Sequence, residues 1–540
     1  MKPQSKLAML VFIIGLLWAS TGAAQVAPPL PPAAFDVIGF IQEATLDGTV
    51  ANTAVNPLPN TSPLAGGTLT VNGIKMLVPN NTIVQMAAAS FTWAQLFDPL
   101  VSRSIGYAPR RPNHAATNTG LALADPGVTR FPSFEVRAVG NITPHPTNGT
   151  PQYIVGLIAP ATQQGLNAGF GIINYIDYTG AVLGMPGRFR VGGILNDPTT
   201  GAILEINDPV GRWGAVHSPD PRLTSDTGSP TVAAANGFPV GIPRVAPQLL
   251  AGGGLDPTFV GDPERPYTNR PLNGDPVFPI DPFLALGAPL KTFNMPAAGT
   301  PGFLTDPTKQ IPLMVGDAID YQGTLMKIDP RAAAPNTPAN MFISVHTLGA
   351  DLGVFTEPGV QPCYLTIEAF LVPTAEVRNQ PQSFGGSPPT PIPLENGTAI
   401  HIVGFTTDTS QLIDIYAIDV DPLSGAETER LITTVLPETI GPGLVRGRFR
   451  FQASRSTGTA PATREYIAKS RTGQMANVAN GLTSGQYRLP CFDFLFAEHT
   501  VFGAPTVPNA FNMMPFLALG SGPLGGTGPV VSRLDPWPGP

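Results

Sequence analysis

The sequence predicts an all-β fold of tandem small β-barrels, OB-like in type, joined by long segments rich in proline and glycine. Its apolar runs last about four to eight residues, carry Val, Ile, Phe or Tyr, and end at Gly, Pro, Asn or Asp, as strands do. Proline (63) and glycine (59) are abundant, yet 42% of the 540 residues are hydrophobic. This balance favours a folded protein with many turns over a disordered chain. Several of the predicted strands also carry an internal glycine.

The internal glycine recurs in four similar runs, "IGFIQEATLD", "YIVGLIAPAT", "AIDYQGTLMK" and "HIVGFTTDTS". A glycine within a strand is typical of a bulge or a bend, and such irregularities curl a sheet toward closure. We therefore expect related small barrels, closed or partly open, of the OB type.

The N-terminus has the pattern of a secretory signal peptide. Lys2 and Lys6 precede an uninterrupted apolar run, Leu7 to Trp18, and small residues follow before Gln25. This pattern predicts cleavage of residues 1–24. The apolar run is shorter than the ~20 residues that span a bilayer. We expect a secreted, extracellular protein, with a periplasmic location as the alternative and no transmembrane anchor after cleavage.

The first β-module is expected over residues 25–110. Within 66–84, apolar and polar residues alternate on both sides of Asn72-Gly73. An Asn-Gly pair adopts the positive φ of a two-residue hairpin at little cost, so a hairpin is predicted here. The clearest helical candidate is Ser90–Phe97, with Ser90 as its cap and a following Asp-Pro as its end.

Three further β-modules are expected over residues 130–217, 311–385 and 390–510. Residues 218–310 are crowded with proline and glycine and contain no convincing strand. A structureless segment of that length is uncommon in a compact domain, so this one should wrap the barrels or be partly mobile. Residues 511–540 form a Pro/Gly-rich tail.

Asp-Pro occurs 13 times and is this chain's usual way to end a strand. Proline pushes the preceding residue out of the helical region, and an Asp carboxylate accepts hydrogen bonds from nearby backbone amides. Asp208, in "EINDPVGRWG", fits this habit. Arg212 and Trp213 are the unusual residues there and are our candidate binding residues. We favour a tryptophan packed at a barrel rim with the arginine on turn carbonyls; the alternative is a tryptophan stacked on a sugar ring.

The two cysteines, Cys363 and Cys491, form a candidate disulfide, because an exported chain passes through an oxidising compartment. Two unpaired buried thiols are the alternative.

Common catalytic signatures are missing from the sequence. There is no G-x-S-x-G elbow, no S-x-x-K and no H-E-x-x-H, and the six histidines are widely separated. No catalytic, cofactor-binding or metal-binding residue is assigned, and the chain is interpreted as a non-enzyme, although a site assembled by the fold stays open. Several acidic residues lie in strand-like runs, and most of them are expected to face water: Glu135, Asp177, Glu205 and Glu368.

Calcium is the single cofactor that the sequence suggests, near Asp419 and Asp421 in the acidic stretch "DIYAIDVDPLSGAETE". Calcium prefers such oxygen ligands, but the spacing departs from that of an EF-hand loop. A solvated hairpin turn is the favoured interpretation of this stretch.

The runs "EINDPVGRWG", "MVGDAIDYQGTL" and "VGFTTDTSQLIDIYAIDVDP" resemble a group of secreted β-rich proteins of unassigned function from fungi and some bacteria. The hairpin "GGTLTVNGIKMLVPNNT" is similar to small OB-like barrel domains of exported bacterial proteins. These resemblances imply secretion and β-architecture, and no catalytic residues.

Three functions are carried forward. The first is a secreted, non-enzymatic surface, matrix or interaction protein. The second is a carbohydrate-binding module array that uses rim aromatics, Trp213, Tyr175, Tyr178 and Tyr416. The third is a secreted hydrolase with a site assembled across modules. A glycan or a cell-surface component is the expected partner. Nucleic acid is excluded, because the net charge is −7 and no strong Lys/Arg cluster occurs.

Overall fold

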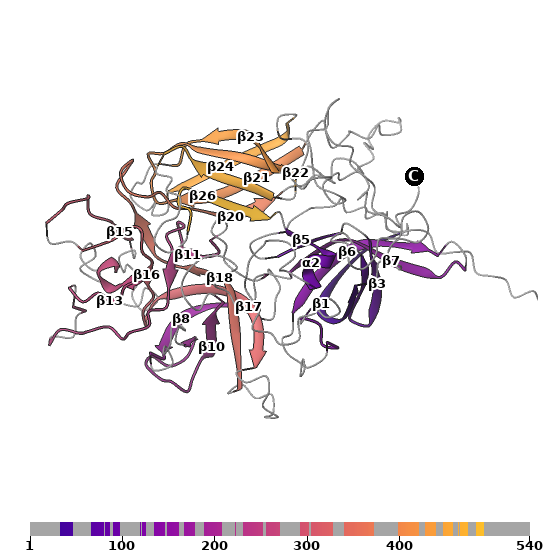
Figure 1. Cartoon of the computed structure of the whole chain (residues 1–540), viewed down its shortest axis with the longest axis horizontal. Helices are drawn as coiled ribbons and strands as arrows, with labels where there is room; N and C mark the ends of the chain where they lie inside the picture. Colours follow the sequence, from indigo (N-terminus) through magenta and orange to yellow (C-terminus); the bar gives the residue numbers. More distant parts are fainter. Residues whose placement is uncertain are drawn as a thin grey trace, which may run out of the picture.

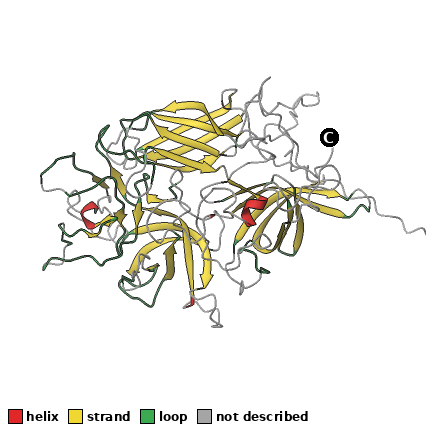
Figure 2. Cartoon of the chain, in the orientation of Figure 1, coloured by secondary structure: helices red, strands yellow, loops and turns green. Residues whose placement is uncertain are grey.

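A computed structural model gives the fold. It describes the following residues: 33–46, 66–79, 82–86, 90–97, 119, 121–125, 134–145, 148–160, 167–178, 188–207, 222, 230–251, 255–256, 258–270, 292–301, 304–327, 340–371, 398–420, 427–438, 447–456, 459, 463, 465–472 and 482–490. The fold is all-β, as predicted, with tandem closed five-stranded barrels, and a two-sheet sandwich follows them (Figures 1 and 2). The helical elements in these residues are one turn, α2, and a short 3-10 turn, η4, and three single residues, 222, 340 and 459, also have 3-10 conformation.

The first barrel is formed by β1 (Ala33–Leu46), β2 (Gly67–Val71), β3 (Ile74–Val78), β6 (Glu135–Pro144) and β7 (Pro151–Pro160). The sheet runs in the order β3-β2-β1-β6-β7, and a parallel pairing of β3 with β7 closes it. This is the strand order of an OB barrel. The predicted hairpin joins β2 to β3, and Asn72 and Gly73 both have positive φ, 51° and 77°.

The predicted helix Ser90–Phe97 is divided in the structure. Residues Ser90–Thr92 form strand β5, which pairs with β4 (Ile83–Gln85), and the helix α2 begins at Trp93 and ends at Phe97. Tertiary pairing overrides the local helical pattern in the first three residues. The Trp93 indole also donates a hydrogen bond to the Thr45 carbonyl (2.9 Å), which fixes α2 against the barrel.

The second barrel repeats the same topology. Its strands are β8 (Ala168–Ile176), β9 (Phe189–Val191), β10 (Ala202–Ile206), β17 (Ala318–Lys327) and β18 (Met341–Ala350). The order is β10-β9-β8-β17-β18, and a parallel pairing of β10 with β18 closes the sheet. A long insertion therefore separates the third strand of this barrel from the fourth.

The insertion packs against the second barrel and contains short strands of two or three residues. They are β11 (Val232–Ala234), β12 (Val240–Gly241), β13 (Gly261–Asp262), β14 (Arg265–Pro266), β15 (Thr292–Asn294) and β16 (Ile311–Pro312). Strand β11 extends the barrel sheet by pairing with β18. Buried ion pairs hold the segment, among them Arg270–Asp317 and Asp262 between Arg244 and Arg265. The described parts of residues 218–310 pack against the barrel, and they contain five short strands, β11 to β15, where the sequence predicts none.

The third unit is a sandwich and departs from the barrel that the sequence predicts over residues 390–510. One sheet has the order β20-β21-β24 and the other β23-β22-β25-β26. This three-plus-four arrangement is that of an immunoglobulin-like sandwich. Its strands are β20 (Leu365–Leu371), β21 (Thr398–Thr406), β22 (Ile413–Val420), β23 (Glu427–Val435), β24 (Arg448–Ser456), β25 (Glu465–Ser470) and β26 (Gln486–Pro490).

The strand pairing divides the chain differently from the predicted modules. Strands β6 and β7, expected in the module at 130–217, complete the first barrel, whereas β8 to β10 belong to the second. The module expected at 311–385 is split too, because β17 and β18 close the second barrel and β20 joins the sandwich. Among the described residues, no helix has the length and apolar character needed to cross a membrane.

Candidate functional site

Several predicted site residues lie outside the described part of the chain. These are the candidate binding residues Arg212 and Trp213, the turn residue Asp208, the calcium candidate Asp421 and the half-cystine candidate Cys491. The signal peptide at 1–24 and the tail at 511–540 lie outside it as well.

The other calcium candidate, Asp419, is buried and occupied by an arginine. Its Oδ2 accepts a hydrogen bond from Arg430 Nε at 2.7 Å, and its Oδ1 accepts one from Nη2 at 3.2 Å. Across the described residues, no group of three or more His, Cys, Asp or Glu side chains is arranged to hold a metal ion. Calcium at this stretch stays a prediction.

Cys363 is a free, buried thiol just before β20. Its Sγ lies 3.2 Å from Thr406 Oγ1, and burial raises the pKa of the thiol. The Cys363 carbonyl accepts a hydrogen bond from the Gly485 amide at 2.5 Å, at the start of β26. The disulfide is not shown.

The tyrosines proposed as sugar platforms are not gathered at one rim. Tyr178 packs against the core of the second barrel, and burial raises the pKa of its hydroxyl, which also shares a hydrogen bond with Tyr267. Tyr416 lies on β22 of the sandwich, with Lys469 Nζ 5.6 Å from its ring centroid. Tyr175 is half-buried on β8.

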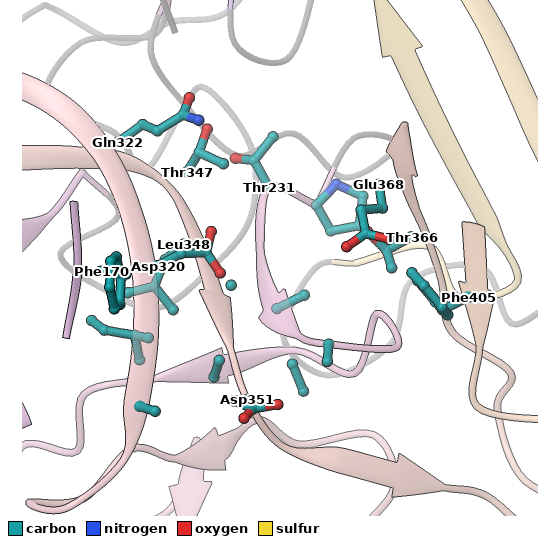
Figure 3. Close-up of a pocket in the computed structure, with 18 of the residues that line it drawn as sticks. Phe170, Thr231, Asp320, Gln322, Thr347, Leu348, Asp351, Thr366, Glu368 and Phe405 are labelled. Carbon is teal, nitrogen blue, oxygen red and sulfur yellow. The ribbon is translucent and has the colours of Figure 1, made fainter. Parts of the chain in front are cut away.

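A cleft of about 680 Å³ lies between the second barrel and the sandwich. One wall is the outer face of β8, β17 and β18. The other wall comes from the sandwich and includes Thr366, Glu368, Phe405 and Tyr487. Figure 3 shows the two sets of labelled side chains on opposite sides of the cavity.

Strand register places the barrel wall's side chains in rows, since directly opposed residues of antiparallel strands share a face. Asp320 on β17 pairs with Phe170 on β8 and with Gly349 on β18. Gln322, two residues on, pairs with Thr347. The central row therefore holds an aromatic ring, a carboxylate and a glycine side by side.

A β-bulge delivers the carboxylate of the opposite wall. In the pairing of β20 with β21, Ile367 faces Gly404 and Ala369 faces Val403, so Glu368 is the extra residue. Bulges commonly re-aim a side chain beside a functional surface. The sequence places Glu368 in a strand facing water; it is exposed, and it faces the cleft.

The ionisable side chains in the described lining of the cleft are all acidic. Its described lining carries three carboxylates, on Asp320, Asp351 and Glu368, and no Lys, Arg or His. Small residues of the barrel wall and of β11 and its flank also line the cleft: Gly171, Ala233, Ala234, Ala235, Ala318, Gly349 and Ala350. The three carboxylates are spread over both walls rather than gathered at one point (Figure 3).

Groups with strongly shifted pKa values lie in the protein interior. Burial lowers the pKa of His346, the extra residue of the bulge between β17 and β18, to about 4, so this imidazole is neutral at pH 7. Burial likewise raises the pKa of Tyr487, which belongs to the sandwich wall of the cleft, to about 12. Both groups keep one protonation state across ordinary pH values.

Sequence reasoning did not find the cleft residues. Phe170, Asp320 and Thr347 come from strands distant in the chain, and only the closure of the barrel brings them together. The alternation around Asp320 in "AIDYQGTLMK" indicates an outward-facing residue, but it contains no information about the neighbouring strands.

Comparison of the chain with protein-family models, with curated proteins and with solved structures finds no match. The resemblance to secreted β-rich proteins stays a prediction.

Proposed function

We propose that this chain is a secreted, non-enzymatic interaction protein that holds its ligand in the cleft between the second barrel and the sandwich. The single observation that carries the proposal is the cleft itself, about 680 Å³ in volume and lined by exposed polar groups over a floor of small residues. Ligand sites in proteins are typically concavities of this size with a few placed polar groups.

The walls support binding because they are formed by sheets rather than by long loops. The barrel wall uses three consecutively paired strands, and the sandwich wall uses β20 and neighbouring residues. A preformed wall loses little conformational entropy when a ligand binds. The cleft also lies at the junction of two units, a common location for ligand sites.

A glycan is the second candidate ligand, and one observation favours it. The Phe170 side chain is 83% exposed, beside the polar side chains of Asp320 and Gln322. An exposed aromatic ring flanked by hydrogen-bonding groups suits the apolar face and the hydroxyls of a sugar. This candidate replaces the rim tyrosines with Phe170 as the stacking residue.

Binding of the labelled mature protein to cells of its source, measured by flow cytometry, tests the proposal. We expect Thr347→Arg, which fills the cleft with a long cationic side chain, to reduce surface binding at least tenfold. Leu431→Arg, on β23 of the sandwich, is the control: the Leu431 side chain is 51% exposed and does not line the cleft, so this variant should bind as the wild type does. Unchanged binding by the cleft variant would refute the cleft as the ligand site.

Two further measurements address the alternatives. A glycan array probed with the wild type identifies a sugar ligand. Phe170→Ala should then lose binding to that sugar. Hydrolase screening of the mature protein with and without a chelator tests the alternative that the protein is a secreted hydrolase. Turnover lost in Thr347→Arg would replace the non-enzymatic proposal with a catalytic one.

A further inference from the structure

We infer that the insertion of the second barrel carries a lipid-binding surface, on which five exposed aliphatic side chains enter the boundary between headgroups and acyl chains of a neutral bilayer. The five are Val245, Leu249, Leu250, Val260 and Leu304, and each is between 43% and 61% exposed. This surface shares no residue with the cleft, so the inference goes beyond the proposed function.

Exposed large apolar side chains are concentrated in the insertion. Five of those in the described part of the chain belong to it, whereas the described strands of the first barrel contribute none. Single exposed apolar residues are ordinary on a protein surface, but a group of them on one segment marks a surface that contacts another apolar phase or partner.

The buried residue Tyr267 holds the base of this surface. Its hydroxyl donates a hydrogen bond to the Val245 carbonyl at 2.7 Å, and its amide donates one to the Val260 carbonyl at 3.0 Å. The hydroxyl of the next residue, Thr268, donates to the Leu304 carbonyl at 3.3 Å. Contacts to two consecutive residues therefore bring three of the five apolar residues together.

The two leucines lie further along the same segment, residues 245–260, which we call the apolar hairpin. An antiparallel bridge joins Leu249 to Leu255, and the Asp256 amide donates a hydrogen bond to the Gln248 carbonyl at 2.9 Å. The insertion, with β13 and β16, lies at the end of the molecule away from the first barrel (Figure 1). Its apolar side chains are thus presented on the outside of the second barrel.

The apolar hairpin carries little charge. Asp256 is its single charged residue, and the Asp256 Oδ1 accepts hydrogen bonds from the amide (2.8 Å) and the hydroxyl (2.7 Å) of Thr258. At the base, Arg244 is paired with the buried carboxylate of Asp262 at 2.5 Å. Recognition of anionic lipid uses clusters of Lys and Arg, so this surface fits neutral, zwitterionic lipid instead.

The size of the surface favours a bilayer over a second copy of the chain. Five half-exposed aliphatic side chains present roughly a few hundred Å² of apolar surface. Each partner in a stable protein interface contributes about 800 Å². A bilayer requires no complementary shape, because apolar side chains enter its interface to a depth of about 5–10 Å, and binding through a small apolar surface is reversible.

Sedimentation of the mature chain with phosphatidylcholine vesicles tests the inference. We expect binding that changes little with salt, because it is not electrostatic. Leu249→Asp combined with Leu250→Asp should reduce the partition coefficient about tenfold or more, and Leu304→Asp about threefold, because each removes buried aliphatic area. Leu436→Asp, at a leucine that is 62% exposed beyond β23 of the sandwich, is the matched control and should bind as the wild type does.

Absence of vesicle binding, or binding that requires anionic lipid, would overturn the inference. Wild-type binding by the leucine double variant would overturn it too, and Leu304→Asp provides the same test if the double variant folds poorly. Sedimentation velocity without lipid addresses the other occupant. A wild-type dimer that the double variant abolishes would assign the surface to a second copy of the chain.

The cleft and the lipid-binding surface are tested separately. Thr347→Arg should bind vesicles as the wild type does, because Thr347 lines the cleft. Cell binding that persists in the leucine double variant, and is lost when Thr347→Arg is added to it, belongs to the cleft. Failure of the vesicle test therefore leaves the proposed function standing, and failure of the cleft variant leaves the lipid-binding surface standing.

Discussion

At the scale of single residues, hydrogen bonds in the turns explain why Asp-Pro pairs are frequent in the sequence. Asp197, Asp256 and Asp306 each precede proline and then threonine. In each case the aspartate Oδ1 accepts hydrogen bonds from both the amide and the hydroxyl of that threonine, at 2.6–2.9 Å. The carboxylate thus closes the turn that proline begins. Sequence reasoning explains these residues well because all the interacting groups are within three positions.

Asn174 illustrates a residue whose role the sequence does not reveal. Its buried side chain donates hydrogen bonds to the carbonyls of Ile194, Asp197 and Thr200 (3.2 Å each) and accepts one from the Gly193 amide (3.0 Å). It therefore holds the whole loop between β9 and β10 in one conformation. Nothing within 15 residues of Asn174 indicates this, because its partners lie on the next hairpin.

We expect Asn174→Ala to lower the free energy of unfolding by about 1–3 kcal/mol, since four partly buried hydrogen bonds to the loop backbone would be lost. Urea unfolding measures the loss, and hydrogen exchange at residues 193–200 should accelerate. Asn196→Gly is the control, because Asn196 is exposed at φ 62°, a conformation that glycine adopts freely. A stability equal to the wild type in Asn174→Ala would contradict this role.

Because of Asp262, the free energy of unfolding should depend on pH in the acid range. Burial alone raises the pKa of this carboxyl, but the hydrogen bond from Arg244 and the charge of Arg265 outweigh burial and hold the pKa well below its usual range. A depressed folded-state pKa stabilises the protein above the unfolded-state value, ~3.9, and that contribution is lost as the pH falls below it.

We therefore expect Asp262→Asn to cost about 3 kcal/mol at pH 7, because it leaves two arginines without their buried partner. The difference from the wild type should shrink as the pH falls from 4 toward 2. Urea unfolding at a series of pH values measures it, with Asp36→Asn, an exposed ion-pair member, as a control expected to lose under about 1 kcal/mol. A difference that is the same at all pH values would disprove the assignment.

At the scale of elements, the internal glycines of the strands do mark irregular pairing. Gly156 is the unpaired residue where β6 and β7 shift register, and Gly323 sits at the shift between β17 and β18. Gly404 lies opposite the bulge at Glu368. Gly39 has a different reason: a Cβ there would come within 2.3 Å of Asn72 Oδ1. Three of the four motif glycines thus act as the sequence predicts.

Gly323, which lies at the register shift where His346 is the extra residue, leads to a direct test. A Cβ at this position would lie 2.5 Å from the Ser344 carbonyl oxygen, which is backbone and cannot move freely. We expect Gly323→Ala to destabilise the second barrel by about 1–3 kcal/mol. Gly171→Ala is the matched control, because its nearest neighbour is a methyl of Val191 that can shift. Equal thermal stability of the two variants would count against a structural role for this glycine.

Strand β26 leads to a test of the candidate disulfide. Its five residues run extended from Gly485, which bonds the Cys363 carbonyl, to Pro490, a length of about 16 Å. Cys491 follows Pro490 directly, and a disulfide needs Cα atoms within about 4.4–6.8 Å. We therefore expect two reactive thiols per unfolded chain without reductant, and one in Cys363→Ser. An unreactive wild type would demonstrate the bridge.

The strands themselves could be predicted from the sequence, whereas their partners could not. Period-two alternation and Asn-Gly turns are local, so runs such as residues 66–78 were assigned correctly. The closing pairs β3–β7 and β10–β18 join strands separated by other elements, and pairing choice depends on shape and burial. The same limit applies to the cleft, because one of its walls belongs to the second barrel and the other to the sandwich.

At the scale of the whole molecule, the first barrel and the sandwich share a hydrophobic core. Val139, Ile154 and Leu157 lie on β6 and β7, yet they cluster with the buried residues of the sandwich rather than with the barrel interior. The Ser90 amide adds a hydrogen bond to Glu465 Oε1 at 2.9 Å. Burial of three large side chains at one junction couples the stability of the two units.

This coupling predicts that the first barrel and the sandwich unfold together in calorimetry. Ile154 is 1% exposed, so Ile154→Ser replaces a buried apolar side chain at the junction by a small polar one, at a cost of about 3–4 kcal/mol. That loss falls on the contact between the units, and we expect the shared transition to separate into two. Val155→Ala, next along β7 but inside the barrel core, should lower the melting temperature without separating the transition. A single transition in Ile154→Ser would mean that the units are coupled elsewhere; two transitions in the wild type would mean that they are not coupled at all.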